Sequence, residues 1–211
     1  MADELVFYTN PRSRGRIVRW MLEEVGQPYR TEVMHYGTTM KEPAYLAINP
    51  MGKVPALRHG DAVVTEAAAI CAYLADAFPQ ARLAPPPGDR LRAPYYRWMF
   101  FAAGPVESAV TNKTFGFDVP AERQGSVGYG NFALVMNALE QAVSQAPYLL
   151  GDNFTAADVY VGSQVGFGLM FNTFDKRPAF ESYWKRISSR PAYARARELD
   201  DALMPPQKAA G

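Results

Sequence analysis

The sequence is poor in the residues that build redox and metal centres. Its 211 residues include one cysteine, Cys71, and two histidines. A single cysteine excludes an internal disulfide and a CxxC redox pair, and so small a set of ligands does not make a cysteine-rich zinc site. We therefore predict no structural metal. We interpret Cys71, which lies inside an apolar helical run, as a small buried hydrophobe rather than a redox centre.

Long apolar runs and a strong net charge are missing as well. No stretch approaches about eighteen consecutive apolar residues, and residues 1–4 lack the basic and then apolar pattern of a signal peptide. The 22 lysines and arginines nearly balance the 21 aspartates and glutamates, so no global field draws the chain to other charged molecules. We expect a cytoplasmic protein with a small, locally bound ligand and with no nucleic-acid or membrane partner.

Hydrophobic periodicity divides the chain into two parts. The first reads β-α-β-α-β-β-α, from a strand at Leu5–Tyr8 to a helix at Glu66–Phe78, which is the order of a thioredoxin-like domain. The proline-rich segment that follows suits a linker, and the rest is predicted to be helical. We predict an α/β plus all-α fold, with a thioredoxin-like domain at 1–82, a linker at 83–88 and an all-helical domain at 89–211.

The second part contains five predicted helices separated by glycine or proline. Thr155 and Asp158 are spaced as a capping box at the start of the third of these helices. The predicted ranges are Asp89 to about Thr114, Ala121–Gln145, Thr155–Phe171, Pro178–Ser188 and Pro191–Leu199.

The segment Asn49–Leu57 and the helix start at Glu66 carry the functional signal. Val54–Leu57 reads as a strand, but Pro55 cannot donate a backbone hydrogen bond, which confines the run to an edge or a turn. Val54 is then free to pair with something else, and a cis Val54–Pro55 bond is compatible with this pattern. Glu66 stands where a helix begins and its unpaired amides attract an anion. An extended peptide beside Val54 therefore has two attachment points.

Together with the loop between Phe7 and Arg16, this segment resembles the cytosolic glutathione S-transferases, the bacterial, beta-like ones most closely. The resemblance spans the chain. It implies that Val54 and Pro55 hold the cysteinyl backbone of glutathione, the co-substrate. Glu66 would meet the α-ammonium of the γ-glutamyl group and the Ala67 amide its carboxylate. Many members of the family have serine where this chain has Ala67, so one hydroxyl contact is missing and a lower affinity for glutathione is expected.

The same resemblance implies that a residue of the first loop activates the thiol. Aligned from the strand end, Ser13 falls where bacterial relatives carry a catalytic cysteine; aligned from the helix, Asn10 falls where other classes carry a tyrosine. Tyr8 is a third candidate, although we expect it in the strand, facing the core. Ser13 is the first choice because it precedes a helix whose amino end favours an anion, yet serine here is equally a good N-cap.

Lys53, or alternatively Lys41, would pair with the glycine carboxylate of glutathione. The second substrate needs an apolar wall, and we expect Phe101 and Phe115 to supply it, while most of the other aromatic residues nearby form the core. The family further implies a homodimer.

The predicted activity is conjugation of the glutathione thiolate to small hydrophobic electrophiles. Two alternatives use the same scaffold: a glutathione-dependent isomerase, dehalogenase or peroxidase, and a non-catalytic glutathione-binding carrier protein in which Ser13 is only a cap.

Overall fold

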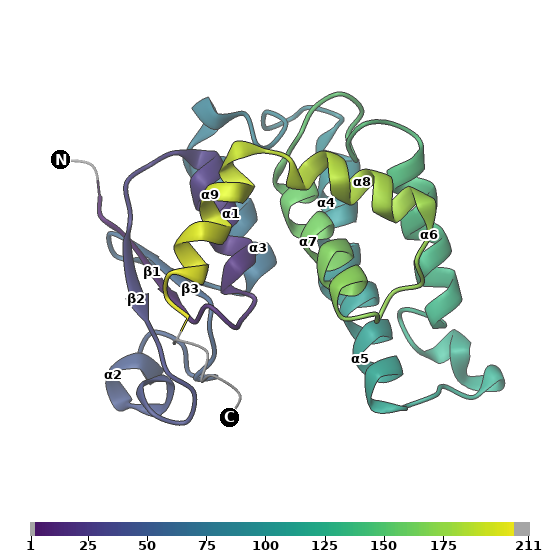
Figure 1. The fold of residues 1–211 in the computed structure, drawn as a ribbon, viewed down its shortest axis with the longest axis horizontal. Helices are drawn as coiled ribbons and strands as arrows, with labels where there is room; N and C mark the ends of the chain where they lie inside the picture. The colour runs from purple at the N-terminus through teal and green to yellow at the C-terminus, as the bar shows by residue number, and fades with distance from the viewer. Residues whose placement is uncertain (1–2, 205–211) are drawn as a thin grey trace, which may run out of the picture. The chain divides into compact units, whose positions relative to one another are not determined.

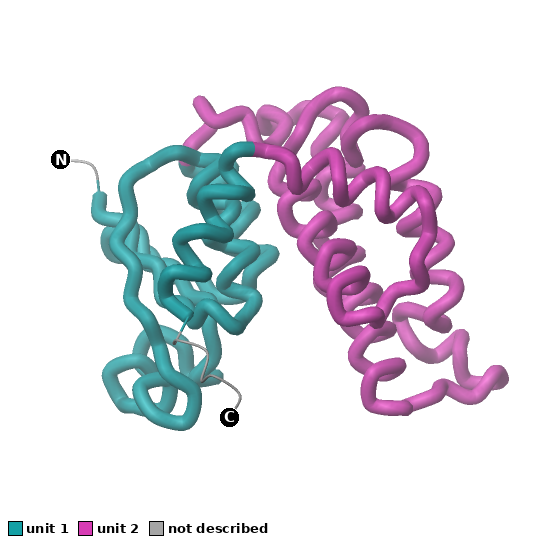
Figure 2. The backbone as a smooth tube through the Cα atoms, viewed as in Figure 1, with its two compact units in different colours: residues 1–77, 191–211 teal, residues 78–190 magenta. Residues whose placement is uncertain are grey.

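The computed structural model describes residues 3–204. The contacts between residues divide the chain into two compact units, residues 1–77 with 191–211 and residues 78–190 (Figure 2). The first unit contains a four-stranded sheet with helices, and the second is helical (Figure 1). The predicted fold class, a thioredoxin-like domain followed by an all-helical region, is confirmed.

The first unit follows the predicted β-α-β-α-β-β-α order. Its sheet has the strand order β2-β1-β3-β4, in which β1 and β2 are parallel and the other pairs are antiparallel. The elements are β1 (Leu5–Thr9), α1 (Gly15–Val25), β2 (Arg30–Val33), the 3₁₀ turn η1 (Thr39–Lys41), α2 (Pro43–Leu46), β3 (Ala56–His59), β4 (Ala62–Thr65) and α3 (Ala67–Ala77).

The side chains of β1 alternate between the two faces of the sheet, as strand geometry requires. Val6 and Tyr8 belong to a buried cluster that includes Tyr45 of α2. Phe7 lies on the other face, where the guanidinium of Arg19 from α1 is 5.1 Å from its ring centroid. Helix α2 and helix α1 therefore cover opposite faces, and α3 packs beside α1.

The last helix, α9 (Pro191–Asp201), packs along α1 (Figure 1). The sequence prediction placed this helix in the C-terminal domain, whereas its contacts group it with the sheet-containing unit. A buried ion pair contributes to this packing: Arg19 Nε lies 3.0 Å from Asp200 Oδ1, and both side chains are almost fully buried. A linear reading of hydrophobic periodicity carries no information about such a long-range pair.

The second unit contains two departures from the predicted helices. The first predicted helix is divided into α4 (Arg92–Phe101), a π-helical turn η3 (Ala102–Val106) and α5 (Glu107–Phe115). Pro105 lies inside η3, and proline lacks an amide proton and clashes with the carbonyl four residues earlier, so the regular ladder is interrupted there.

The second predicted helix begins eleven residues later than expected. Residues Ala121–Ser126 form the 3₁₀ helix η4, and α6 starts at Phe132 and ends at Ser144. Gly130 adopts a φ of 66°, which a helix excludes, and the Asn131 side chain caps the new start by accepting a hydrogen bond from the Leu134 amide at 2.9 Å.

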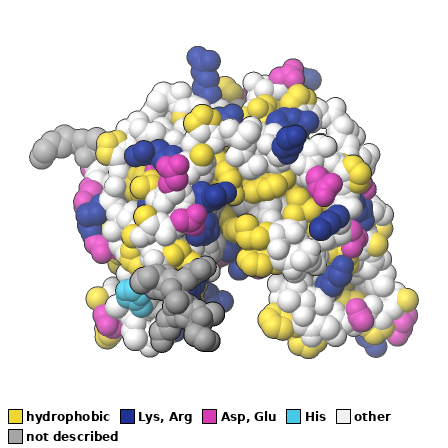
Figure 3. All heavy atoms as spheres, viewed as in Figure 1, with side chains coloured by type: hydrophobic (Ala, Val, Ile, Leu, Met, Phe, Trp, Pro, Cys, Tyr) yellow, Lys and Arg dark blue, Asp and Glu magenta, His cyan; other side chains and the backbone are white. Residues whose placement is uncertain are grey.

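The remaining elements of this unit are η2 (Pro79–Ala81), α7 (Ala156–Met170) and α8 (Pro178–Ser188). The predicted capping box is present at the start of α7, where Asp158 Oδ2 accepts from the Thr155 amide at 2.9 Å. On the face drawn in Figure 3, acidic and basic side chains are interspersed, in keeping with the balanced composition.

Candidate functional site

The register of the sheet brings the predicted glutathione-binding segments to one end of it. Tyr8 of β1 pairs with Ala56 of β3, and Ala56 pairs with Thr65 of β4. Adjacent strands lie about 4.8 Å apart. The segment after β1, the segment before β3 and the segment after β4 therefore all lie at the same end of the sheet. These segments carry Ser13, Val54–Pro55 and Glu66–Ala67.

Val54 and Pro55 lie directly before β3 and are joined by a cis peptide bond. The predicted strand started at Val54, but β3 starts at Ala56, because Pro55 has no amide proton to give to a ladder. Among residues 3–204, the Val54 amide and carbonyl have no hydrogen-bond partner. Two adjacent backbone groups are thus open to an extended peptide.

Glu66 forms the junction between β4 and α3 and has a positive φ of 67°. A residue other than glycine in this region costs about 1–3 kcal/mol, and such outliers concentrate at functional sites. Its carbonyl accepts from the Ile70 amide at 2.9 Å, so the residue starts the helix. The carboxylate is exposed and has no partner within residues 3–204, while Ala67 is buried in the first turn of α3, where the amides lack intrahelical partners.

Ser13 is engaged as a turn-forming residue. Its hydroxyl donates to the Asn10 carbonyl at 2.7 Å and accepts from the Gly15 amide at 2.9 Å. The single hydroxyl proton is therefore committed to the loop itself. Donation to a bound sulfur requires the hydroxyl to rotate away from the Asn10 carbonyl, while the Gly15 bond can persist.

The other two candidates in this region are engaged in structural contacts. Asn10 is buried; its Nδ2 donates to the Met34 carbonyl at 2.8 Å and its Oδ1 accepts from the Arg12 amide at 3.0 Å. Tyr8 lies in β1 and its ring packs against Tyr45 with centroids 5.7 Å apart, as the sequence analysis expected.

Lys53 is exposed, and its carbonyl accepts hydrogen bonds from Tyr45 at 2.7 Å and Asn49 at 2.8 Å. Lys41, the alternative, donates from Nζ to the Gly52 carbonyl at 3.1 Å and to the Met51 carbonyl at 3.4 Å. Of the two ammonium groups, that of Lys53 has no protein partner within residues 3–204.

Sequence reasoning missed three residues that shape the first loop. Thr9 is fully buried, and its hydroxyl has no hydrogen-bond partner in the described part of the chain. A Cβ on Gly15 would lie 1.9 Å from that oxygen, so only glycine fits at position 15. Arg16 donates to the Pro11 carbonyl and to Asp201 Oδ1 of α9, each at 2.6 Å. The glycine was a readable signal, whereas the Arg16 bridge needed the position of α9.

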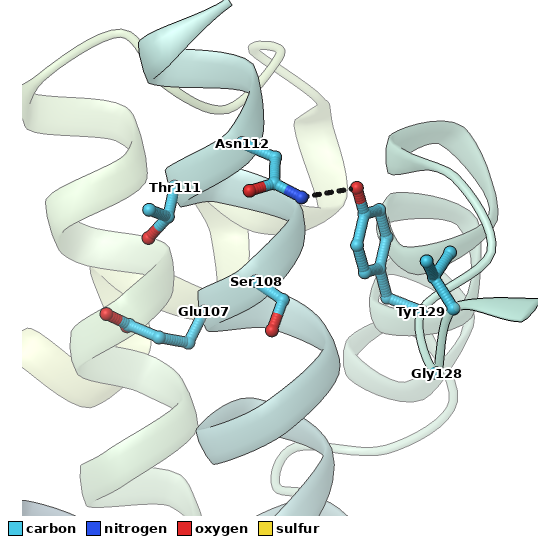
Figure 4. Close-up of a pocket in the computed structure, with 7 residues that line it drawn as sticks. Glu107, Ser108, Thr111, Asn112, Gly128 and Tyr129 are labelled. Atoms are coloured by element: carbon cyan, nitrogen blue, oxygen red, sulfur yellow. Dashed lines mark hydrogen bonds between the residues drawn. The ribbon is translucent and has the colours of Figure 1, made fainter. Parts of the chain in front are cut away.

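The helical unit contains a pocket of about 500 Å³ between α5 and the loop before α6 (Figure 4). Five of its seven lining residues have polar side chains, and Asn112 Nδ2 donates to the Tyr129 hydroxyl at 2.8 Å. The lining residues are Glu107, Ser108, Thr111, Asn112, Val127, Gly128 and Tyr129.

The two predicted pocket residues do not line this cavity. Phe101 is partly buried and packs edge-on against Trp98 at 5.5 Å between centroids. Phe115 is 69% exposed near Phe117. Their role in binding an electrophile stays a prediction.

Residues 3–204 contain neither an exposed thiol nor a cluster of metal-binding side chains. Cys71 is fully buried, and burial raises the pKa of its thiol far above the ordinary value, which disfavours a reactive thiolate. Between residues 3 and 204, histidine, cysteine, aspartate and glutamate side chains form no cluster suited to a metal ion. In that same range no helix has both the length and the apolar character that crossing a membrane requires.

Comparison with known proteins identifies the family. A model described as the glutathione S-transferase N-terminal domain matches residues 13–77. A maleylacetoacetate isomerase from Pseudomonas aeruginosa is 30% identical over 205 residues, which cover 90% of this chain and 93% of that protein. The chain belongs to the glutathione S-transferase family.

Solved structures of glutathione transferases have a similar fold over nearly the whole of this chain. A glutathione transferase from Methylococcus capsulatus has a TM-score of 0.77 at 27% identity, covering 94% of this chain and 99% of that chain. A transferase homologue from Sulfitobacter, solved with bound glutathione, has a TM-score of 0.73 at 27% identity, covering 95% of this chain and 99% of that one.

The region that the family model matches contains part of the candidate site in this member of the glutathione S-transferase family. It starts at Ser13 and ends with α3, so it includes Lys53, Val54 and Glu66 but leaves out Asn10. Members of this superfamily are mostly enzymes that use glutathione as a co-substrate.

Proposed function

We propose that this chain is a bacterial, beta-like glutathione transferase that conjugates the thiolate of glutathione to small hydrophobic electrophiles. The observation that carries the proposal is that two groups at one end of the sheet, the Val54 backbone and the Glu66 carboxylate, have no partner within residues 3–204. One suits the cysteinyl backbone of glutathione and the other its α-ammonium. We also propose detoxification in the cytoplasm as a homodimer, which rests on the family.

The residue roles are part of the same proposal. Val54 and Pro55 receive the cysteinyl unit, Glu66 and the Ala67 amide receive the γ-glutamyl end, and Lys53 receives the glycine carboxylate. Ser13 is the proposed donor to the sulfur, with Asn10 as the alternative. Phe101 and Phe115 stay the proposed apolar contacts of the electrophile.

Replacing Glu66 with alanine is expected to abolish retention on immobilised glutathione. The substitution leaves the γ-glutamyl ammonium without its counterion, and loss of a charge-assisted bond of about 1.5–3 kcal/mol weakens binding by roughly 10- to 100-fold. Asp61→Ala is the matched control, because Asp61 is an exposed carboxylate in the turn at the opposite end of the β3–β4 pair. Full retention of Glu66→Ala would contradict the proposed site.

Replacing Ser13 with alanine is expected to raise the pKa of the bound glutathione thiol by one unit or more. A free thiol of this type has a pKa of about 8.5, and one charge-assisted hydrogen bond of roughly 1.5–3 kcal/mol lowers it by about one to two units. The measurement is a titration of thiolate absorbance in wild type, Ser13→Ala and Asn10→Ala.

Protein stability has to be measured beside this titration. Ser13 accepts from the Gly15 amide, and loss of such a cap costs about 0.5–2 kcal/mol by itself. A Ser13→Ala variant that is less stable but ionises glutathione normally would make Ser13 a cap and pass the role to Asn10.

Two observations favour alternatives. The 30% identical relative is named a maleylacetoacetate isomerase, which favours an isomerase as the second candidate; dehalogenation and peroxidation rely on the same thiolate. The commitment of the Ser13 proton to the Asn10 carbonyl favours a non-catalytic glutathione carrier. Glutathione binding with turnover of an electrophile panel, of maleylacetoacetate, or of neither separates these functions.

A further inference from the structure

The carbonyl of Lys53 is held by two buried side chains at once. The Tyr45 hydroxyl donates to it at 2.7 Å and Asn49 Nδ2 donates at 2.8 Å. Both donors come from α2 and the turn that follows it. A carbonyl that accepts two hydrogen bonds uses both of its lone pairs, so its direction is fixed.

Fixing this carbonyl also fixes the next amide. The peptide unit is planar, and in a trans peptide the N–H points opposite to the C=O. The cis bond in this segment is the following one, Val54–Pro55, so the Lys53–Val54 peptide is trans. The Val54 N–H therefore points away from Tyr45 and Asn49. It is the same N–H that has no partner within residues 3–204.

Each donor is itself locked in place. Tyr45 is 3% exposed, and its ring packs on Tyr8 in the cluster beneath the sheet. Burial, with a smaller contribution from Tyr8, raises the pKa of its hydroxyl to about 12, so the group remains a donor near neutral pH. Asn49 is also buried, and its Oδ1 accepts from the Met51 amide at 3.1 Å, which orients its Nδ2 toward Lys53.

The turn before Lys53 also receives hydrogen bonds, from the side chain of Lys41. Lys41 Nζ contacts the Met51 and Gly52 carbonyls. Gly52 has a φ of 58°, and a Cβ there would lie 2.7 Å from the Met40 carbonyl oxygen. Three successive carbonyls, at residues 51 to 53, are thus fixed by side chains. These hydrogen bonds restrain the segment that leads into Val54.

We propose that Tyr45 and Asn49 are positioning residues that aim the Val54 N–H at the cysteinyl carbonyl of glutathione. This inference rests on the proposed function. The two residues act on the peptide of the ligand rather than on its sulfur. They therefore set the affinity for glutathione and leave the ionisation of the bound thiol unchanged.

The test uses two near-isosteric variants. Tyr45→Phe keeps the ring packed on Tyr8 and removes only the hydroxyl. Asn49→Asp keeps the acceptor for the Met51 amide and replaces the donor with an oxygen that repels the Lys53 carbonyl. The matched control is Tyr73→Phe, which also removes a hydroxyl from a hydrogen bond in this unit, the 2.9 Å contact with His59 Nδ1.

Each variant is titrated with glutathione by calorimetry, assayed for KM and kcat with any electrophile that the wild type turns over, and melted thermally. We expect the Kd and KM for glutathione to rise about tenfold in Tyr45→Phe and more in Asn49→Asp. We further expect kcat and the pKa of the bound thiol to stay unchanged, and Tyr73→Phe to bind like wild type. A purely structural role would lower the melting temperature without this split between KM and kcat.

A second readout needs no ligand. In the free protein, the amide resonance of Val54 is expected to shift in Tyr45→Phe and in Asn49→Asp, and to stay in place in Tyr73→Phe. An unmoved Val54 resonance, or an unchanged Kd in folded variants, overturns the inference while the proposed function stands. If the wild type itself binds no glutathione, both fail.

Discussion

Replacing Asp158 with alanine is expected to lower the free energy of unfolding by about 3–5 kcal/mol. Its carboxylate is fully buried and accepts four hydrogen bonds, so alanine leaves several buried donors without partners. The donors are the amides of Leu149 and Thr155 and the hydroxyls of Tyr183 and Thr155. Urea denaturation measures the loss, with the exposed Asp152→Ala as the control.

The same residue makes stability depend on pH. Burial raises the pKa of Asp158 from 3.8 to about 6, against the opposing effect of its hydrogen bonds. A raised folded-state pKa means that the folded state holds the proton more tightly, so this contribution is fully present below 3.8 and is lost as the pH rises through about 6. The rise corresponds to about 3 kcal/mol.

Asp158→Asn isolates this contribution. Asparagine does not titrate, so the stability of the wild type relative to Asp158→Asn should fall as the pH rises through the window from 3.8 to about 6. A difference that stays constant across this range would contradict the raised pKa. A loss below about 1 kcal/mol for Asp158→Ala would show that the four donors find other partners.

Replacing Asp200 with alanine is expected to lower stability by a similar amount, about 3–5 kcal/mol, because it strands the buried guanidinium of Arg19. That group is 3.0 Å from Asp200 Oδ1 and lies between the rings of Phe7 and Tyr29, and it also donates to Tyr29 and Thr31. The loss is measured by denaturation of the full chain, monitored with a probe placed where α1 and α9 are in contact.

The neighbouring Asp201 supplies the matched control. It pairs with Arg16 and Arg197 but is half exposed, and exposed ion pairs contribute about 0–1 kcal/mol. Asp201→Ala should therefore be nearly neutral. Removing both charges, as in Arg19→Met with Asp200→Leu, should recover most of the stability lost in Asp200→Ala. Equal effects of Asp200→Ala and Asp201→Ala would contradict a contribution of the buried pair to the packing of α9 on α1.

Local chemistry explains which elements the sequence predicted well. Ile17, Val18 and Met21 repeat at helical spacing, and Gly26 ends α1 with a φ of 71°, so this helix was readable. The capping box of α7 was readable for the same reason. The π-helical turn at Pro105 and the late start of α6 at Phe132 were missed. The prediction relied on the spacing of apolar residues and gave too little weight to Pro105, Gly130 and Asn131.

Long-range contacts explain what the sequence did not predict. Helix α9 is linked to α1 by Arg19 and Asp200, which are far apart in the chain, and the contact between Arg16 and Asp201 depends on α9 in turn. The segments with Val54 and Glu66 could be proposed from the sequence because proline in a strand and an acidic helix start are local signals. The hydrogen bonds from Tyr45 and Asn49 could not be predicted in this way, because they end on the backbone carbonyl of Lys53 and a backbone acceptor leaves no mark in the sequence.

The proposed glutathione site is tested most directly by a titration of isotope-labelled protein with glutathione, followed through its backbone amide resonances. We expect saturable shifts that are largest at Val54 and Ala67 and small at the pocket of the helical unit that Glu107 and Tyr129 line. In Glu66→Ala, all of these shifts should require a higher glutathione concentration to saturate. Saturable shifts confined to that pocket, or no saturable shift at all, would contradict the placement of the glutathione site at the end of the sheet.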